Sequence, residues 1–111
     1  SMKKRLYCYF HDGKLEVVSF DKTRIRFYNQ FDAPYSRDAA YYMLYVWKQL
    51  GFEALDDELF LCGDMPDKTW LVEAMKNYLK KVFVINITAD FNRSPITKIQ
   101  GMPIDMMMLY L

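Results

Sequence analysis

The sequence predicts an α/β domain built on a mixed five-stranded sheet, and three observations lead to this prediction. Residues up to Phe31 form short alternating runs joined by turn residues, which is typical of antiparallel strands. From Ser36 onward, helical periodicity alternates with short continuous apolar runs. The chain has 111 residues, of which 52% are hydrophobic and 17% aromatic. This length and composition suit one packed core, so we expect a single domain over residues 3–111.

Three antiparallel strands are predicted in the first part of the chain. Arg5 to Phe10 has apolar side chains on both faces, which is typical of a central strand. Asp12-Gly13 is a strong hairpin signal and leads into a second strand, Leu15 to Phe20. The third strand, Thr23 to Phe31, alternates polar and apolar residues and carries two arginines. We therefore expect a half-solvated edge strand that is protected against mispairing.

An amphipathic helix is predicted between Ser36 and Gly51. Ser36 is the expected N-cap, Asp38 places negative charge in the first turn, and Gly51 can supply the left-handed residue that ends the helix. The expected buried stripe consists of apolar residues at helical spacing: Ala39, Ala40, Met43, Val46, Trp47 and Leu50.

The remainder of the chain alternates strands with helices. Glu58 to Cys62 and Val82 to Ile87 are continuous apolar runs, as expected of strands covered on both faces. Asp67 is expected to cap a second helix that extends to about Leu79. Its apolar stripe should comprise Trp70 or Leu71, Ala74, Met75, Tyr78 and Leu79. A last helix is predicted from the spacing of Ile104, Met107, Met108 and Leu111.

These elements, in the order βββαβαβα, favour the spatial strand order 3-2-1-4-5. The strand from Glu58 belongs beside the strand from Arg5, because both are apolar on two faces. Right-handed crossovers then place the first two helices on one face of the sheet and the last helix on the other. Cys8 and Cys62 should lie on adjacent parallel strands as buried, reduced thiols.

This arrangement is ribonuclease H-like, and the chain resembles one lobe of the actin, sugar kinase and heat-shock-protein-70 superfamily of ATPases. Within that superfamily it is similar to an uncharacterised bacterial family of actin-like fold. The most specific segment, LFLCGDMPDKTWLVEAMKNYL from Leu59 to Leu79, resembles the strand, Gly-Gly turn and helix that cradle adenosine. The resemblance implies a vestigial nucleotide site. Gly63 matches the first glycine of the turn, and Asp64 stands in place of the second. Asp12-Gly13 is similar to part of the phosphate-gripping hairpin, although an ordinary hairpin turn explains it better.

Two functions from different classes remain open. The first is a non-catalytic module for protein interaction or lobe–lobe contact, with no catalytic residue and no cofactor. The second is the nucleotide-binding half of an ATPase, with ATP as the cofactor and its other motifs outside this chain. Tyr41, Tyr42 and Tyr45 are expected toward the flank or back of the first helix, outside its buried stripe, and Met106 lies in a methionine-rich ending. They suggest an adaptable apolar surface for a protein partner, a second lobe or a second copy.

Several other function classes are disfavoured by composition. The formal net charge is +1 with acids and bases interspersed, so we expect no nucleic-acid partner. No apolar run approaches the ~18 residues of a membrane span, and we expect a cytoplasmic protein. Asp64 has no companion carboxylates for a two-metal nuclease, and we expect no metal site. His11 is expected to be a turn histidine.

Overall fold

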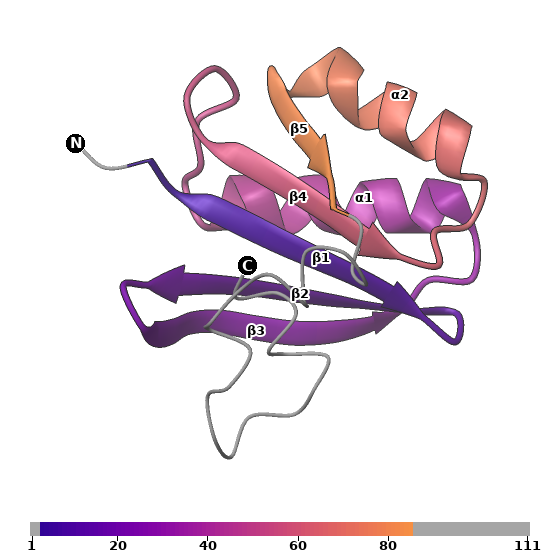
Figure 1. The fold of residues 1–111 in the computed structure, drawn as a ribbon, viewed down its shortest axis with the longest axis horizontal. Helices are drawn as coiled ribbons and strands as arrows, with labels where there is room; N and C mark the ends of the chain where they lie inside the picture. The colour runs from indigo at the N-terminus through magenta and orange to yellow at the C-terminus, as the bar shows by residue number, and fades with distance from the viewer. Residues whose placement is uncertain (1–2, 86–111) are drawn as a thin grey trace.

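A mixed five-stranded sheet carries two helices on one face in this computed structural model, which describes residues 3–85 (Figure 1). The last predicted helix and the last two residues predicted for the fifth strand lie outside the described residues. In chain order the elements are β1 (Arg5–His11), β2 (Lys14–Asp21), β3 (Arg24–Asp32), α1 (Ser36–Gln49), β4 (Glu58–Gly63), α2 (Lys68–Tyr78) and β5 (Lys81–Val84).

The strand order β3-β2-β1-β4-β5 confirms the predicted α/β topology. β1 pairs antiparallel with β2 and parallel with β4, so it is the central strand, as predicted from its two apolar faces. Cys8 is paired with Leu61, and Tyr9 is paired with Cys62. The two cysteines therefore lie on adjacent parallel strands, as predicted, but their side chains point to opposite faces of the sheet. Both are buried and free.

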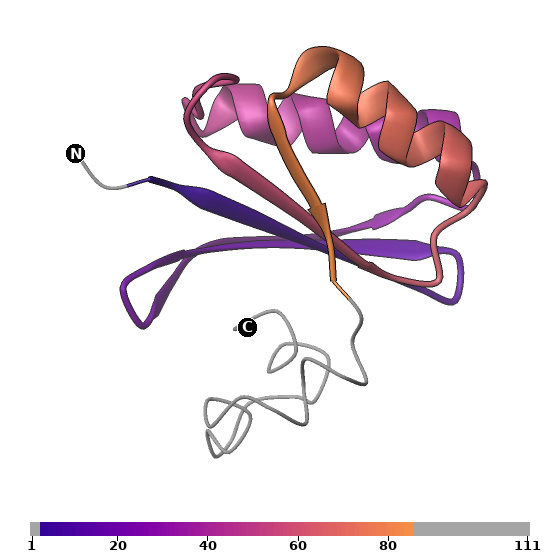
Figure 2. The same cartoon turned by 45° about the horizontal axis from the view of Figure 1, so that its top comes forward.

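The two helices cover the same face of the sheet (Figure 2). α1 buries five of the six residues predicted for its stripe, and Leu50, after its end, is half-buried. α2 buries Leu71 and Met75, and Leu79 is buried directly after it. The other predicted members of this stripe behave differently: Trp70 and Ala74 are half-buried and Tyr78 is 65% exposed. Only one of the two adjacent apolar stripes of α2 faces the sheet.

Both helix starts differ from the prediction in detail. Ser36 is already helical, so the N-cap position falls on Tyr35, whose extended backbone precedes the helix and whose side chain makes no cap hydrogen bond. Asp67 occupies the N-cap of α2 as predicted, but in a left-handed conformation with φ 44° and without a side-chain cap hydrogen bond. Burial of the apolar stripes, and not side-chain capping, therefore holds the two helices in place.

β3 is an edge strand that is more exposed than its alternation predicts. Phe27 and Phe31 are half-buried against the core, but Ile25 is 47% exposed. A register shift between Ser19 and Phe20 pairs Ile25 with Phe20, a residue of the opposite sheet face. This irregularity breaks the alternation and turns Ile25 away from the core.

The second face of the sheet carries an aromatic row. Tyr7 of β1 stacks on Phe60 of β4 with ring centroids 5.1 Å apart, and Phe60 stacks on Phe83 of β5 at 5.2 Å. Tyr7, Val18 and Cys62 are buried there in a second, smaller cluster. The helix predicted to cover this face falls on residues outside those that the structure describes.

Candidate functional site

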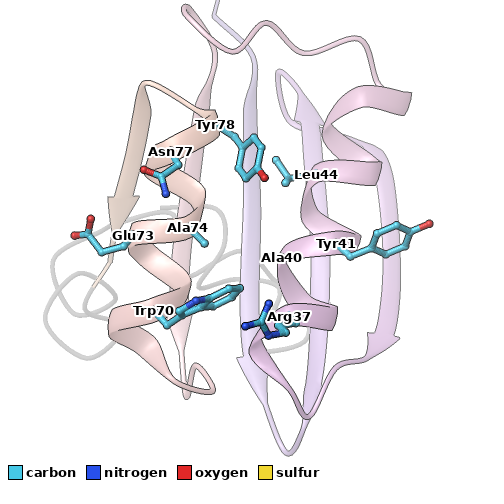
Figure 3. A pocket seen from close by; sticks show the side chains of 9 residues that line it. All are labelled: Arg37, Ala40, Tyr41, Leu44, Trp70, Glu73, Ala74, Asn77 and Tyr78. Carbon is cyan, nitrogen blue, oxygen red and sulfur yellow. The ribbon is translucent and has the colours of Figure 1, made fainter.

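A groove lies between α1 and α2 on the outer side of the helical layer (Figure 3). Its volume is about 540 Å³. Trp70 and Tyr78 point from α2 toward α1, where Arg37 lies opposite Trp70 and Leu44 lies opposite Tyr78. The groove exists because small side chains, Ala40 and Ala74, stand where the two helices approach. Its lining residues are Arg37, Ala40, Tyr41, Leu44, Trp70, Glu73, Ala74, Asn77 and Tyr78.

One end of the groove is closed by Arg37 and Trp70. The guanidinium of Arg37 lies over the Trp70 ring, 5.2 Å from its centroid. Both residues belong to the first turn of their helices, and they meet because α1 and α2 run in the same direction (Figure 3). A cation over the face of tryptophan is attracted by the ring quadrupole, so this contact holds the Arg37 head group at this end of the groove.

The three tyrosines predicted to meet a partner occupy different environments. Tyr41 and Tyr45 are 64% and 50% exposed, and their rings stack with centroids 6.1 Å apart. Tyr42 is half-buried and stacks on Phe31 of β3 at 4.5 Å, where it fixes α1 against the edge of the sheet. Met106, the fourth predicted residue, lies outside the described residues. The structure therefore places Tyr41 and Tyr45 together on the surface, beside the groove.

The Asp12-Gly13 segment has the geometry of a two-residue hairpin turn. His11 pairs with Lys14, and both turn residues have positive φ, 51° for Asp12 and 71° for Gly13. The Gly13 carbonyl accepts a hydrogen bond of 2.8 Å from the amide of Ala33. This is the backbone that tight hairpins require. A loop of two residues offers few amides to surround a phosphate.

Gly63 meets a steric requirement of strand pairing. Its φ is +93°, and a Cβ at this position would lie 2.1 Å from the carbonyl oxygen of Phe10. The Asp64 amide donates a 2.8 Å hydrogen bond to the same oxygen. Glycine is therefore needed for the close approach of β4 to β1.

The pairing of Phe10 with Gly63 brings the predicted nucleotide residues to one edge of the sheet. Asp12-Gly13 follows β1 and Gly63-Asp64 ends β4, so both pairs lie at the carboxyl ends of parallel strands. This is the edge at which open α/β sheets bind ligands. None of these residues lines the helical groove or a second cavity of about 470 Å³ beside residues 34–37.

A polar cluster that the sequence analysis missed joins β1, β2 and β3. Glu16 is only 3% exposed and accepts a 2.5 Å hydrogen bond from the Tyr28 hydroxyl. A second hydrogen bond of 2.5 Å joins Glu16 to Nε2 of His11. His11 is thus the last residue of β1 and not part of the turn, because the strand pairing continues to Lys14. The signal available in the sequence was Glu16 itself, a single acidic residue among the apolar residues of β2.

The two cysteines are buried thiols of low reactivity. Burial raises the pKa of the Cys8 thiol well above 9.0 and that of Cys62 to about 12. A protonated thiol is a poor nucleophile and a poor metal ligand. Within residues 3–85, no three His, Cys, Asp or Glu side chains come together as metal ligands. None of the helices in this part of the chain is long and apolar enough to cross a bilayer.

Comparison with known proteins identifies the family. The profile of the family described as "Protein of unknown function (DUF3822)" matches residues 1–82. The chain belongs to this family. A crystal structure from Bacteroides thetaiotaomicron VPI-5482, described as a protein with actin-like ATPase fold and unknown function, matches 75% of this chain with a TM-score of 0.71 and 32% sequence identity. The likeness confirms the actin-like fold predicted for this DUF3822 chain, which spans 32% of that protein's length. A search of curated proteins found no match.

Proposed function

We propose that this domain is a non-catalytic module that acts through protein–protein or lobe–lobe contact. The observation that carries the proposal is the exposed aromatic surface of the helical layer: Tyr78 lines the groove, and the stacked Tyr41 and Tyr45 are exposed on α1 beside it. Tyrosine and tryptophan are enriched at the centres of protein interfaces, because they bury a large area and keep a polar group for hydrogen bonding. The solved relative supports a lobe contact, since most of its chain lies outside the matched part.

The reactive side chains support a non-catalytic role. The Cys8 and Cys62 thiols stay protonated near neutral pH, because burial raises the pKa of each. Glu16 is buried and already bonded to His11 and Tyr28. These contacts tie the polar cluster to the sheet, so we assign it to stability.

Site-directed photocross-linking tests the interaction proposal. With a photoreactive phenylalanine analogue in place of Tyr45, we expect discrete adducts with a protein partner, or with a second copy, in cells of the native host. Leu55 is the matched control, because it is also exposed but lies in the loop after α1. Equal adducts at both positions, or none at either, would contradict the proposal.

The nucleotide-binding half of an ATPase is the second candidate. It is supported by the actin-like ATPase fold of the solved relative and by the gathering of Asp12, Gly13, Gly63 and Asp64 at one sheet edge. This function needs further motifs on another lobe. Titration of the chain with magnesium and ATP separates the two candidates.

A further inference from the structure

We infer that the groove between α1 and α2 binds one amphipathic helix of a partner protein, apolar at its centre and acidic at both ends. The inference rests on the proposed interaction function and adds the chemistry of the partner. Three features support it: the shape of the groove, its lack of free backbone groups and the position of two cations on α1.

The shape of the groove fits a third helix. Ala40 and Ala74 leave space between two helices that run in the same direction, and the side chains of a further helix can enter such a space as ridges enter grooves. Trp70, Tyr78 and Leu44 supply the apolar walls. The volume of about 540 Å³ has room for several apolar side chains.

The backbone of the groove walls favours a helix over an extended peptide. Along α1 and α2 the amides and carbonyls are used within the helices, so they offer no ladder to an added strand. A strand docked here would leave its own buried backbone groups unpaired, at a cost for each. A helix satisfies its backbone internally and presents only side chains to the groove.

The cations on α1 determine the charge of the partner. Arg37 lines the groove, and Lys48, eleven positions further along α1, lies beyond its lining residues. At this spacing they share one side of the helix, separated by about 16 Å along its axis. Leu44 and Ala40 lie between them. Neither cation forms an ion pair with any of residues 3–85.

The opposite wall restricts where the acids can lie. Glu73 lies on α2 at the rim of the groove, between Trp70 and Tyr78, and its carboxylate points away from α1 (Figure 3). An acidic residue at the centre of the bound helix would be repelled by Glu73, whereas acids at its two ends would approach Arg37 and Lys48. The groove thus selects an apolar centre flanked by carboxylates.

Two synthetic peptides test the inference on the full 111-residue chain. One is a helix of about four turns with leucines at helical spacing and glutamates at both ends, and the other carries lysines in place of the glutamates. We expect the glutamate peptide to bind at least about tenfold more tightly at low salt, measured by calorimetry and by Trp70 fluorescence. Trp47 is on the buried side of α1 and provides an internal reference.

Variants locate the binding and its charge preference. Ala74→Gln fills the groove and should weaken the glutamate peptide about tenfold, whereas Ala54→Gln, in an exposed loop position, should leave binding unchanged. The double variant Arg37→Glu and Lys48→Glu should reverse the preference and favour the lysine peptide, an outcome that loss of folding could not produce.

Equal binding of both peptides, no binding of either, or wild-type affinity in Ala74→Gln would overturn the inference. Together with the cross-linking experiment, these measurements distinguish failure of this inference from failure of the proposed function. If adducts form at Tyr45 but no peptide binds, the partner is not a helix of this chemistry and the interaction function stands. If the glutamate peptide binds but no adduct forms, the groove has the inferred chemistry and the interaction function is wrong.

Discussion

Gly63 is the residue whose backbone leaves the least choice of side chain. A Cβ there would lie 2.1 Å from the Phe10 carbonyl oxygen, and φ is +93°. We expect Gly63→Ala to lower the free energy of unfolding by about 3 kcal/mol or more in urea denaturation, because strain and overlap act together. Gly51 is the control: its φ is +73° but nothing lies within 4 Å, so Gly51→Ala should cost only about 1 kcal/mol. Equal losses would show that the strands do not approach so closely.

The buried thiols make stability depend on pH in the alkaline range. Burial raises the folded-state pKa of Cys62 from 9.0 to about 12, so above pH 9 the unfolded chain loses its proton first. The contribution of the thiol to the free energy of unfolding is therefore fully present below pH 9. It is lost as pH rises toward 12, by at most about 1.4 kcal/mol per pH unit for each thiol. In guanidinium denaturation between pH 7 and pH 10.5, Cys62→Ala should show a shallower loss than the wild type. Parallel curves would contradict this assignment.

At the scale of elements, the start of α1 can be improved. Tyr35 holds the N-cap position in extended conformation, is exposed, and makes no side-chain cap hydrogen bond. A serine hydroxyl at this position can accept a hydrogen bond from an amide in the first turn. We therefore expect Tyr35→Ser to raise the free energy of unfolding by about 0.5–1 kcal/mol relative to Tyr35→Ala. Equal stability of the two variants, measured by thermal and urea denaturation, would argue against a free cap position.

The strand order was predictable because local signals agreed with the global constraint. Asp12-Gly13 requires a tight hairpin, and the two apolar faces of β1 require neighbours on both sides. Right-handed crossovers then place both α1 and α2 on one face of the sheet. The N-cap of α1 was not predictable in the same way, since Ser36 and Tyr35 differ by one position and only backbone geometry separates them.

The groove was not predictable because α2 carries two adjacent apolar stripes. Residues 71, 75 and 79 form one stripe and residues 70, 74 and 78 form the other, and both have helical spacing. Which of them faces the sheet depends on packing against α1 and β4, which periodicity does not contain. The purely aliphatic and methionine stripe is buried, and the stripe with Trp70 and Tyr78 faces the groove. Residue types suited to interfaces were thus visible, but their location was not.

At the scale of the whole molecule, the helical groove and the nucleotide edge lie in different parts of the domain. The groove lies on the outer side of the helical layer, whereas Asp12 and Asp64 follow the carboxyl ends of β1 and β4. Loss of one function by mutation should therefore leave the other unchanged, because the two sites share no lining residue.

Titration with ATP and magnesium decides whether this domain acts alone on nucleotides. We expect no measurable heat of binding, because the hairpin at Asp12 has only two turn residues and the Gly63 backbone is occupied by its contact with Phe10. A micromolar Kd corresponds to about −8 kcal/mol, which requires several pre-formed contacts. If such binding is observed and is lost in Asp64→Lys but not in Ala74→Gln, the sheet edge is a nucleotide site and the ATPase function replaces the non-catalytic one.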